Sequence, residues 1–292
     1  MENTWKISFF QKLKAFFDLT KFRLSITVVF SSCFGFSLYS SEFDFPRLLL
    51  FALAAFCVTA SANIINQIKE IDLDKLMTRT VNRPLPSGRL SIREAAIFGF
   101  LLGLFGLSII SLVYNIPAAL ISLLSLVLYG FVYTPLKRVG PIAVAVGALP
   151  GAFPPMIGWV AASGHFGLEP GILFAIQFFW QFPHFWAIAW VLDDDYKRAG
   201  FKLLPSKGGK DLNSAIQIVI YTLFLLPLCW VPYYLQMTKI DSAVIALLCG
   251  ILFLAQTLYL MKERTKKAAM GLMFGSFLYL PIVQIAYLMN KF

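Results

Sequence analysis

The chain has 292 residues, of which 59% are hydrophobic and only 14% are charged, and its mean hydropathy is +0.74. A soluble domain of this size would need more charge to cover its surface. Uncharged windows of about 17 residues or more recur as far as the C-terminus, which excludes a soluble protein and a single cleaved signal peptide. The net charge of +10 could indicate nucleic-acid binding, and the positions of the charges along the chain test that interpretation below.

Nine membrane-spanning helices are predicted, so the expected fold class is an all-α polytopic membrane bundle forming a single domain over residues 1–292. The expected spans are 24–40, 48–68, 95–113, 115–133, 140–161, 170–191, 213–234, 241–261 and 269–289. Residues 1–23 are predicted to form an interfacial amphipathic segment. Its apolar face carries Phe9, Phe10, Leu13, Phe16 and Phe17. The four cysteines lie in apolar segments and are interpreted as small buried hydrophobes.

Lys and Arg gather on one side of the predicted membrane. All but Arg47, Lys239 and Lys291 fall in the N-terminal segment or in the loops after the second, fourth, sixth and eighth spans. By the positive-inside rule this side is cytoplasmic, with the N-terminus inside. The positive charge is therefore mostly topological, and no nucleic-acid partner is expected.

Asn66, Glu70 and Asp74 end the second span at a spacing of four residues. On a helix this spacing puts one amide and two carboxylates in a single column, with Asp72 on another face. Oxygen ligands of this kind, completed by phosphate oxygens, suit Mg²⁺. A solvated helix end with scattered charges is the alternative interpretation.

The loop 69–94 that follows contains Arg79 and Arg83 within a stretch rich in Pro and Gly. Arginine can make bidentate contacts with phosphate oxygens. Metal-binding carboxylates beside these arginines predict a site for a diphosphate. Lys137, after the fourth span, could reach the same group, and so could Arg138, unless both only anchor the topology.

The sixth span ends in three aspartates, of which Asp194 and Asp195 are the candidates for a second Mg²⁺. Lys197 and Arg198 follow as diphosphate partners, and the loop 192–212 is predicted to be the second active-site loop. A surface acidic patch is the alternative. His184 lies deeper in the same span, where an ionisable group is either functional or hydrogen-bonded to a neighbouring helix.

Together these motifs resemble the UbiA-type intramembrane prenyltransferase superfamily and, within it, the protohaem IX farnesyltransferases (haem O synthases). The matching stretches are 66–74, 77–80, 82–89, 133–138, 151–159, 181–185, 194–200 and 203–205. They include Asn-Arg-Pro-Leu-Pro-Ser-Gly-Arg at 82–89 and Gln-Phe-Pro-His-Phe at 181–185. The chain departs from the broad pattern at Glu70, where many members carry Asp, at Phe22, where Pro is expected, and in lacking a DxxxD spacing in the second motif.

The resemblance implies transfer of a farnesyl group from farnesyl diphosphate to a vinyl group of haem B, giving haem O and diphosphate with the help of Mg²⁺. It implies catalytic roles for Asp72 or His184 in placing a water, or a role for His184 at the haem iron. It also implies a substrate pocket lined by Asn63, Tyr133 and Tyr196. The protein is expected in the bacterial inner membrane, with its active site facing the cytoplasm. Haem-handling proteins of the terminal oxidase pathway are possible partners.

Three alternatives remain at this level. The first is a related prenyltransferase acting on an aromatic quinone precursor. The second is a transporter, although its binding residues would be expected near the bilayer midplane rather than at helix ends. The third is a membrane haem electron carrier, which usually needs paired axial histidines within the bundle, whereas of the two histidines here only His184 is suitably placed.

Overall fold

The computed structural model describes residues 8–42, 44–207 and 209–292, and within them it confirms the predicted helical bundle. Nine helices there are long and apolar enough to cross a membrane. They are α2 (Phe22–Tyr39), α3 (Phe45–Lys69), α5 continued by η1 (Ile92–Tyr114), α6 continued by η2 and α7 (Ile116–Leu136), α8 (Ile142–Ser163), α9 (Leu168–Val191), α11 to α13 (Leu212–Tyr234), α14 (Ile240–Glu263) and α15 (Lys266–Met289). Shorter helices are α1 (Phe9–Leu19), α4 (Ile71–Asp74) and α10 (Asp193–Arg198).

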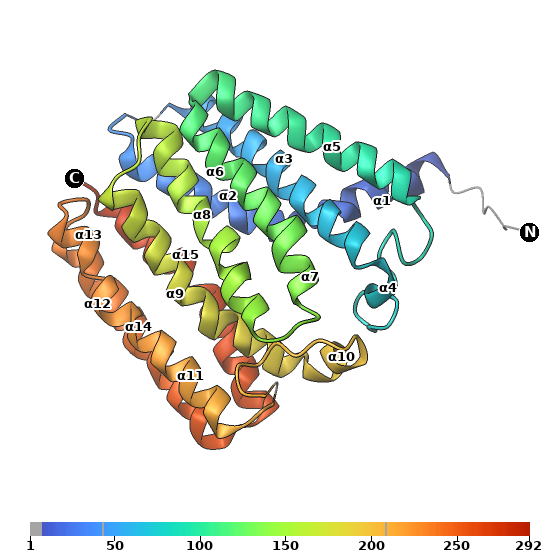
Figure 1. Ribbon diagram of the computed structural model, residues 1–292. Helices are drawn as coiled ribbons and strands as arrows, with labels where there is room; N and C mark the ends of the chain where they lie inside the picture. The colour runs from blue at the N-terminus through green and yellow to red at the C-terminus, as the bar shows by residue number, and fades with distance from the viewer. Residues whose placement is uncertain (1–7, 43, 208) are drawn as a thin grey trace, which may run out of the picture.

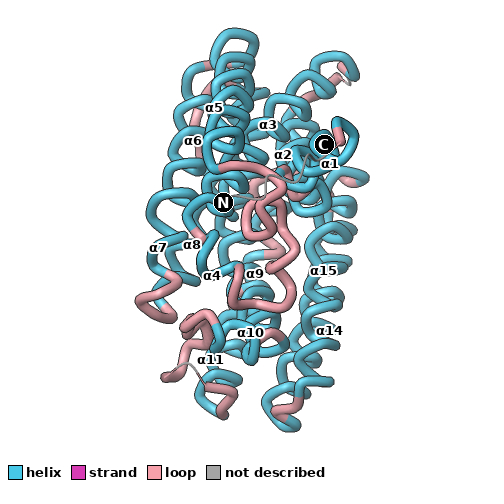
Figure 2. Tube along the Cα trace, turned by 90° about the vertical axis from the view of Figure 1, so that its right-hand side faces the viewer, coloured by secondary structure: helices cyan, strands magenta, loops and turns pink. Residues whose placement is uncertain are grey.

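The long helices run side by side, with α8 and α9 in the middle of the bundle (Figures 1 and 2). Helix α8 packs against α2, α6 and α9, while α9 also packs against α11 and α15. Helices α3 and α5 form a pair at one end of this arrangement, and α14 and α15 form a pair at the other. The central position of α8 and α9 agrees with their large buried share and their low charge.

A polar network ties α2, α8, α9 and α15 together inside the apolar bundle. Pro155 has no N–H to donate to the carbonyl oxygen of Gly151, and Gln177 Nε2 supplies a donor at 2.8 Å instead. Gln177 Oε1 in turn accepts from Ser31 Oγ at 2.6 Å and from Gln284 Nε2 at 3.2 Å. The proline that weakens α8 therefore also fixes how its neighbours pack around it.

Two glycines set the close approach of α2 to α8. A Cβ at Gly158 would lie 1.8 Å from the backbone oxygen of Ser32, and one at Gly35 would lie 1.9 Å from that of Pro155. Because backbone atoms cannot move aside as a flexible side chain can, these positions accept only glycine at this helix separation.

Helix α1 begins at a capping box made by Ser8 and Gln11. The side chains of Phe9, Phe10 and Phe17 are exposed on it, as expected of an interfacial amphipathic helix. Phe16, predicted on the same face, instead packs edge-on against Phe98 of α5 at 5.0 Å. Residues 1–7 of the predicted interfacial segment lie outside the described residues.

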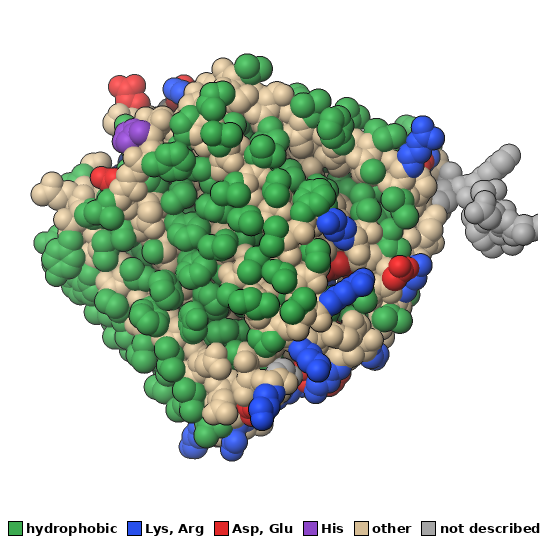
Figure 3. Space-filling view, viewed as in Figure 1, with side chains coloured by type: hydrophobic (Ala, Val, Ile, Leu, Met, Phe, Trp, Pro, Cys, Tyr) green, Lys and Arg blue, Asp and Glu red, His purple; other side chains and the backbone are tan. Residues whose placement is uncertain are grey.

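The end of the bundle formed by residues 70–91, 192–207 and 209–211 is called here the motif end. Figure 3 shows hydrophobic side chains over most of one face, with most of the Lys and Arg on that face near the motif end. Helix α3 and helix α9 are each interrupted there in the same way, at Glu70 (φ −103°, ψ 11°) and at Leu192 (φ −99°, ψ 13°). Short helices α4 and α10 follow, so the predicted continuous helix through Glu70 is wrong in this detail.

Candidate active site

A cavity of about 680 Å³ opens at the motif end. Its polar wall comes from α3, α4 and the loop behind them, and its aromatic wall comes from η2, α9 and the second loop. The side chains that line it are Phe17, Asp18, Lys21, Phe22, Arg23, Leu24, Asn66, Glu70, Asp74, Met77, Arg79, Arg83, Tyr129, Tyr133, Lys137, Val144, Phe185, Ile188, Tyr196, Phe201 and Leu203. Its size is within the range of small-molecule sites in proteins.

The predicted column of oxygen ligands lines this cavity. Asn66, Glu70 and Asp74 keep one direction despite the interruption at Glu70, because the backbone resumes helical form immediately in α4. All three are buried, and Asp74 has no exposed surface. Two carboxylates buried this close to one another require positive charge beside them.

A second column lies beside the first in the cavity wall. Tyr129, Tyr133 and Lys137 are also spaced by four residues, and the first two lie on the π-helix η2 (Leu128–Tyr133). Pro135 can donate no backbone N–H, and Thr134 Oγ1 reaches back to the oxygen of Tyr129 at 2.8 Å. Widened turns of this kind occur often at functional sites. Here the turn directs two phenols and one ammonium into the cavity.

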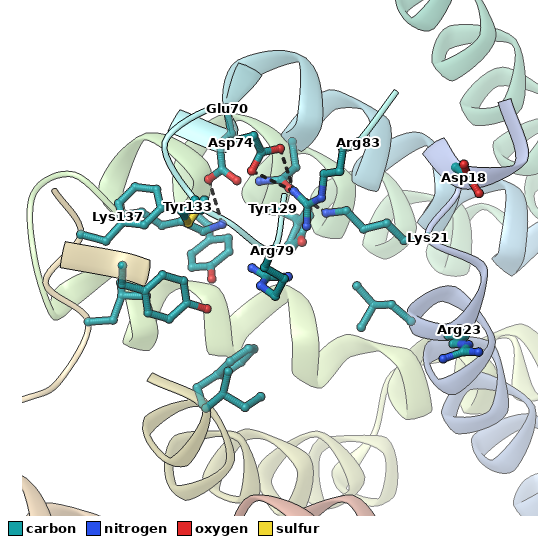
Figure 4. Close-up of a pocket in the computed structure, with 18 of the residues that line it drawn as sticks. Asp18, Lys21, Arg23, Glu70, Asp74, Arg79, Arg83, Tyr129, Tyr133 and Lys137 are labelled. Atoms are coloured by element: carbon teal, nitrogen blue, oxygen red, sulfur yellow. Dashed lines mark hydrogen bonds and ion pairs between the residues drawn. The ribbon is translucent and has the colours of Figure 1, made fainter. Parts of the chain in front are cut away.

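Both carboxylates of the first column contact a basic side chain (Figure 4). Lys137 Nζ lies 2.8 Å from Glu70 Oε1, and Arg83 Nη1 contacts both oxygens of Asp74 at 2.7 and 3.0 Å. Burial opposes the charge on Lys137, but the nearby Glu70 outweighs it and raises the pKa of Lys137 above its usual value.

Lys21 completes the set by donating to Asn66 Oδ1 at 2.9 Å. The sequence interpretation missed it, counting Lys21 only as a topological charge. Its backbone is left-handed (φ 48°, ψ 53°), which turns the chain from α1 into α2 and directs the side chain inward. Burial, followed by repulsion from Arg83 and Lys137, lowers the pKa of Lys21 to about 7.

Two further arginines are available for an anion. Arg79 and Arg23 both line the cavity and are exposed, and neither makes an ion pair or side-chain hydrogen bond within the described part of the chain. Arg79 extends into the middle of the cavity in Figure 4. The basic residues around the cavity thus outnumber its acidic ones, Asp18, Glu70 and Asp74. An anionic ligand suits this balance.

The second acidic motif does not line the cavity. Asp193 is buried and pairs with Lys197 at 2.8 Å and Lys210 at 3.3 Å, while Asp194 is 77% exposed. Asp195 accepts from Thr78 Oγ1 at 2.9 Å and pairs with Arg198, and this contact joins the two loops. These hydrogen bonds, Arg198 first, lower the pKa of Asp195.

Only Tyr196 of this motif reaches the cavity. The predicted second metal pair and the predicted diphosphate partners Lys197 and Arg198 are therefore not brought to the first column in this structure.

Four other predicted site residues also lie elsewhere. Asp72 is 88% exposed and pairs with Lys75, and Arg138 is exposed outside the cavity. Asn63 is buried and donates to Ser25 Oγ at 3.1 Å, which supports the start of α2. His184 faces α15 rather than the cavity, although its neighbour Phe185 lines it.

The first column fits Mg²⁺ by the chemistry of its donors. Its three oxygen-bearing side chains are the hard ligands this ion prefers, and the contact of Glu70 Oε1 with Lys137 lacks hydrogen-bond geometry, so the oxygen keeps an unused lone pair. Among the described residues no group of three or more His, Cys, Asp or Glu gathers closely enough to hold a metal. Asn66 and phosphate oxygens would therefore have to complete the coordination.

The sequence model of the UbiA prenyltransferase family matches residues 28–280. A protoheme IX farnesyltransferase from Cytophaga hutchinsonii is 57% identical, covering 96% of this chain and 98% of its own length. One from Christiangramia forsetii is 45% identical, covering 96% and 94%.

Solved structures agree with the fold. A digeranylgeranylglyceryl phosphate synthase superposes with a TM-score of 0.80 at 26% identity, covering 96% of this chain and 98% of its own. A UbiA homologue from Archaeoglobus fulgidus bound to DMAPP and Mg²⁺ superposes with a TM-score of 0.67 at 18% identity, covering 93% and 98%. By its whole-length similarity, this chain belongs to the UbiA prenyltransferase family and, within it, to the protohaem IX farnesyltransferases.

Proposed function

We propose that this chain transfers a farnesyl group from farnesyl diphosphate to a vinyl group of haem B, releasing diphosphate and giving haem O. One observation carries the proposal: a column of buried oxygen donors lies beside a column of tyrosines and a lysine at the mouth of a partly apolar cavity. The names of the whole-length relatives support haem as the acceptor.

The basic side chains of the cavity would hold the diphosphate. Arg79 has no ion-pair or side-chain hydrogen-bond partner among the described residues, and Lys21, Arg83 and Lys137 would turn from the column toward phosphate oxygens. Asn66, Glu70 and Asp74 would then hold Mg²⁺, which when bound neutralises charge on the departing diphosphate. Until Mg²⁺ and the diphosphate bind, the contacts with Lys21, Arg83 and Lys137 balance the negative charge of the two carboxylates.

Loss of diphosphate from the farnesyl group leaves an allylic cation that must be kept from water. Tyr129, Tyr133 and Phe185 supply aromatic walls, whose negative faces favour a nearby cation. The terminal vinyl carbon of haem attacks C1 of the farnesyl group, and water then adds at the adjacent carbon with loss of a proton. Asp72, predicted to place that water, lies outside the cavity wall in this structure.

The remaining assignments are part of the same proposal. The positive-inside distribution supports a cytoplasmic position for the motif end, with loops 69–94 and 192–212, in a bacterial cell with an inner membrane. The exposed phenylalanines of α1 would lie in the membrane interface beside it. Haem-handling partner proteins would then approach from the membrane or from the cytoplasm.

Product analysis tests the proposal. Purified protein in nanodiscs is incubated with Mg²⁺ and farnesyl diphosphate, and with either haem B or 4-hydroxybenzoate. We expect haem O by mass in the first mixture and no prenylated product in the second. Prenylated hydroxybenzoate without haem O would indicate the quinone branch, and no product with either acceptor, from protein that still binds farnesyl diphosphate, would refute prenyl transfer to both.

A further inference from the structure

The turn between α1 and α2 contains two buried backbone oxygens that need donors from elsewhere in the protein. They belong to Leu19, the last residue of α1, and to Thr20, and both residues are buried. Within the described part of the chain, no backbone N–H donates to either oxygen. Buried carbonyl groups in proteins are nearly always hydrogen-bonded, so side chains must supply the donors at this turn.

Helix α3 supplies one of these donors directly and supports the other. Gln67 Nε2 donates to the oxygen of Leu19 at 2.7 Å and to the oxygen of Asn63 in its own helix at 3.2 Å. Ser25 Oγ donates to the oxygen of Thr20 at 2.7 Å, and Asn63 Nδ2 donates to Ser25 Oγ at 3.1 Å. All three side chains are buried, so two amides of α3 hold the turn inside the protein.

Lys21 follows these two residues in the left-handed conformation, which is unfavourable for residues other than glycine. Such a conformation persists only where surrounding contacts hold it. The amide of Gln67 holds the backbone just before Lys21, and the neighbouring Asn66 accepts from the Lys21 ammonium at 2.9 Å. Helix α3 therefore holds the turn that directs this side chain into the cavity, as well as the ammonium at its end (Figure 4).

We propose that Gln67 is a positioning residue for diphosphate binding, because it holds the left-handed turn that brings Lys21 into the cavity. The inference rests on the proposed function, since it takes a prenyl diphosphate as the ligand. Gln67 is not among the described residues that line the cavity, so it would act only through the turn. A glutamine kept for helix packing alone would affect ligand affinity, if at all, independently of Lys21.

The test is a double-mutant cycle on farnesyl diphosphate binding, measured with Mg²⁺ and without haem on the purified chain in nanodiscs. Lys21→Met should weaken binding about 10-fold or more, because it removes a charged hydrogen-bond donor. Gln67→Met removes the amide at similar volume and should weaken binding about 5- to 10-fold. The double variant should bind no more weakly than Lys21→Met, because Gln67 then has no ammonium to position.

Gln284→Met is the matched control. Gln284 is a buried amide of α15 that donates to Ser31 Oγ at 2.8 Å, and neither residue is among those that line the cavity. The control should lower the melting temperature, as Gln67→Met does, but leave farnesyl diphosphate affinity unchanged. Normal affinity in Gln67→Met would overturn the inference. An equal loss in Gln284→Met, or losses that multiply in the double variant, would overturn it as well.

Ser25→Ala decides the question if Gln67→Met fails to fold, because it removes a single oxygen atom from the same turn. It should weaken farnesyl diphosphate binding about 3-fold, and only when Lys21 is present. In that case unchanged affinity in Ser25→Ala, or the same loss in the Lys21→Met background, would overturn the inference.

The outcomes also separate this inference from the proposed function. Haem O formation by a wild-type chain, with binding of farnesyl diphosphate that is insensitive to Gln67, would overturn the inference and leave the function standing. Binding that depends on Gln67 only through Lys21, without any haem O, would support the inference and contradict the function.

Discussion

Removing the ammonium of Lys137 should open Glu70 to divalent cations. The two groups are 2.8 Å apart, with side chains only 13% and 5% exposed. At an effective dielectric constant of about 20, Coulomb's law gives an attraction of about 6 kcal/mol at this distance. Water in the cavity and movement of Lys137 reduce the part of this electrostatic energy that an incoming cation must overcome. We therefore expect Lys137→Met to raise Mn²⁺ affinity by about 1.4 to 3 kcal/mol, or about 10- to 100-fold.

Mn²⁺ binding is measured by electron paramagnetic resonance on nanodisc-embedded protein without prenyl diphosphate. Lys69→Met removes the same charge at the end of α3, where Lys69 is exposed and lies over the ring of Phe131 at 4.3 Å. This control should bind Mn²⁺ as the wild type does. Unchanged or weaker binding in Lys137→Met, or an equal gain in Lys69→Met, would refute the view that Lys137 competes with the metal for Glu70.

Two further predictions concern helix packing and the loops. Gly158→Ala should lower the free energy of unfolding by about 3 kcal/mol or more, because its Cβ would meet a backbone oxygen, whereas Gly171→Ala, with nothing within 4 Å, should change it by less than about 1 kcal/mol. Equal melting temperatures for the two variants would contradict this. Asp195→Ala should speed hydrogen exchange in residues 75–83, since it frees Thr78, and the exposed Asp194→Ala should not. Faster exchange in both, or in neither, would show that Asp195 does not hold the two loops together.

The spans and the first column could be predicted because their signals are local. Uncharged windows determine where helices cross the membrane, and the four-residue spacing of Asn66, Glu70 and Asp74 survives the interruption of α3. The family resemblance was equally available, because it depends on residue order within motifs.

The other features of the site depend on contacts between distant residues, which the spacing of residues in the sequence does not show. Lys21 reaches Asn66 only because a left-handed turn joins α1 to α2, and Tyr129 enters the cavity on a π-helix that only Pro135 hints at. The second motif resembles a metal site in sequence, but its aspartates pair with Lys210 and Thr78, which lie outside the motif and cannot be assigned to it from spacing. His184 lies within α9, in the predicted span 170–191, but which helix it faces was not predictable from the sequence.

The most direct test of the proposed site compares two aspartates in one short helix. Asp74 is fully buried at the cavity and Asp72 is 88% exposed beside Lys75, although both lie in α4. The measurement is haem O formed per enzyme by Asp74→Asn and Asp72→Asn, with equal insertion and folding of both variants confirmed. Our account predicts a loss of about 1,000-fold or more for Asp74→Asn and near-normal turnover for Asp72→Asn. Comparable losses in the two variants, or near-normal activity of Asp74→Asn, would contradict it.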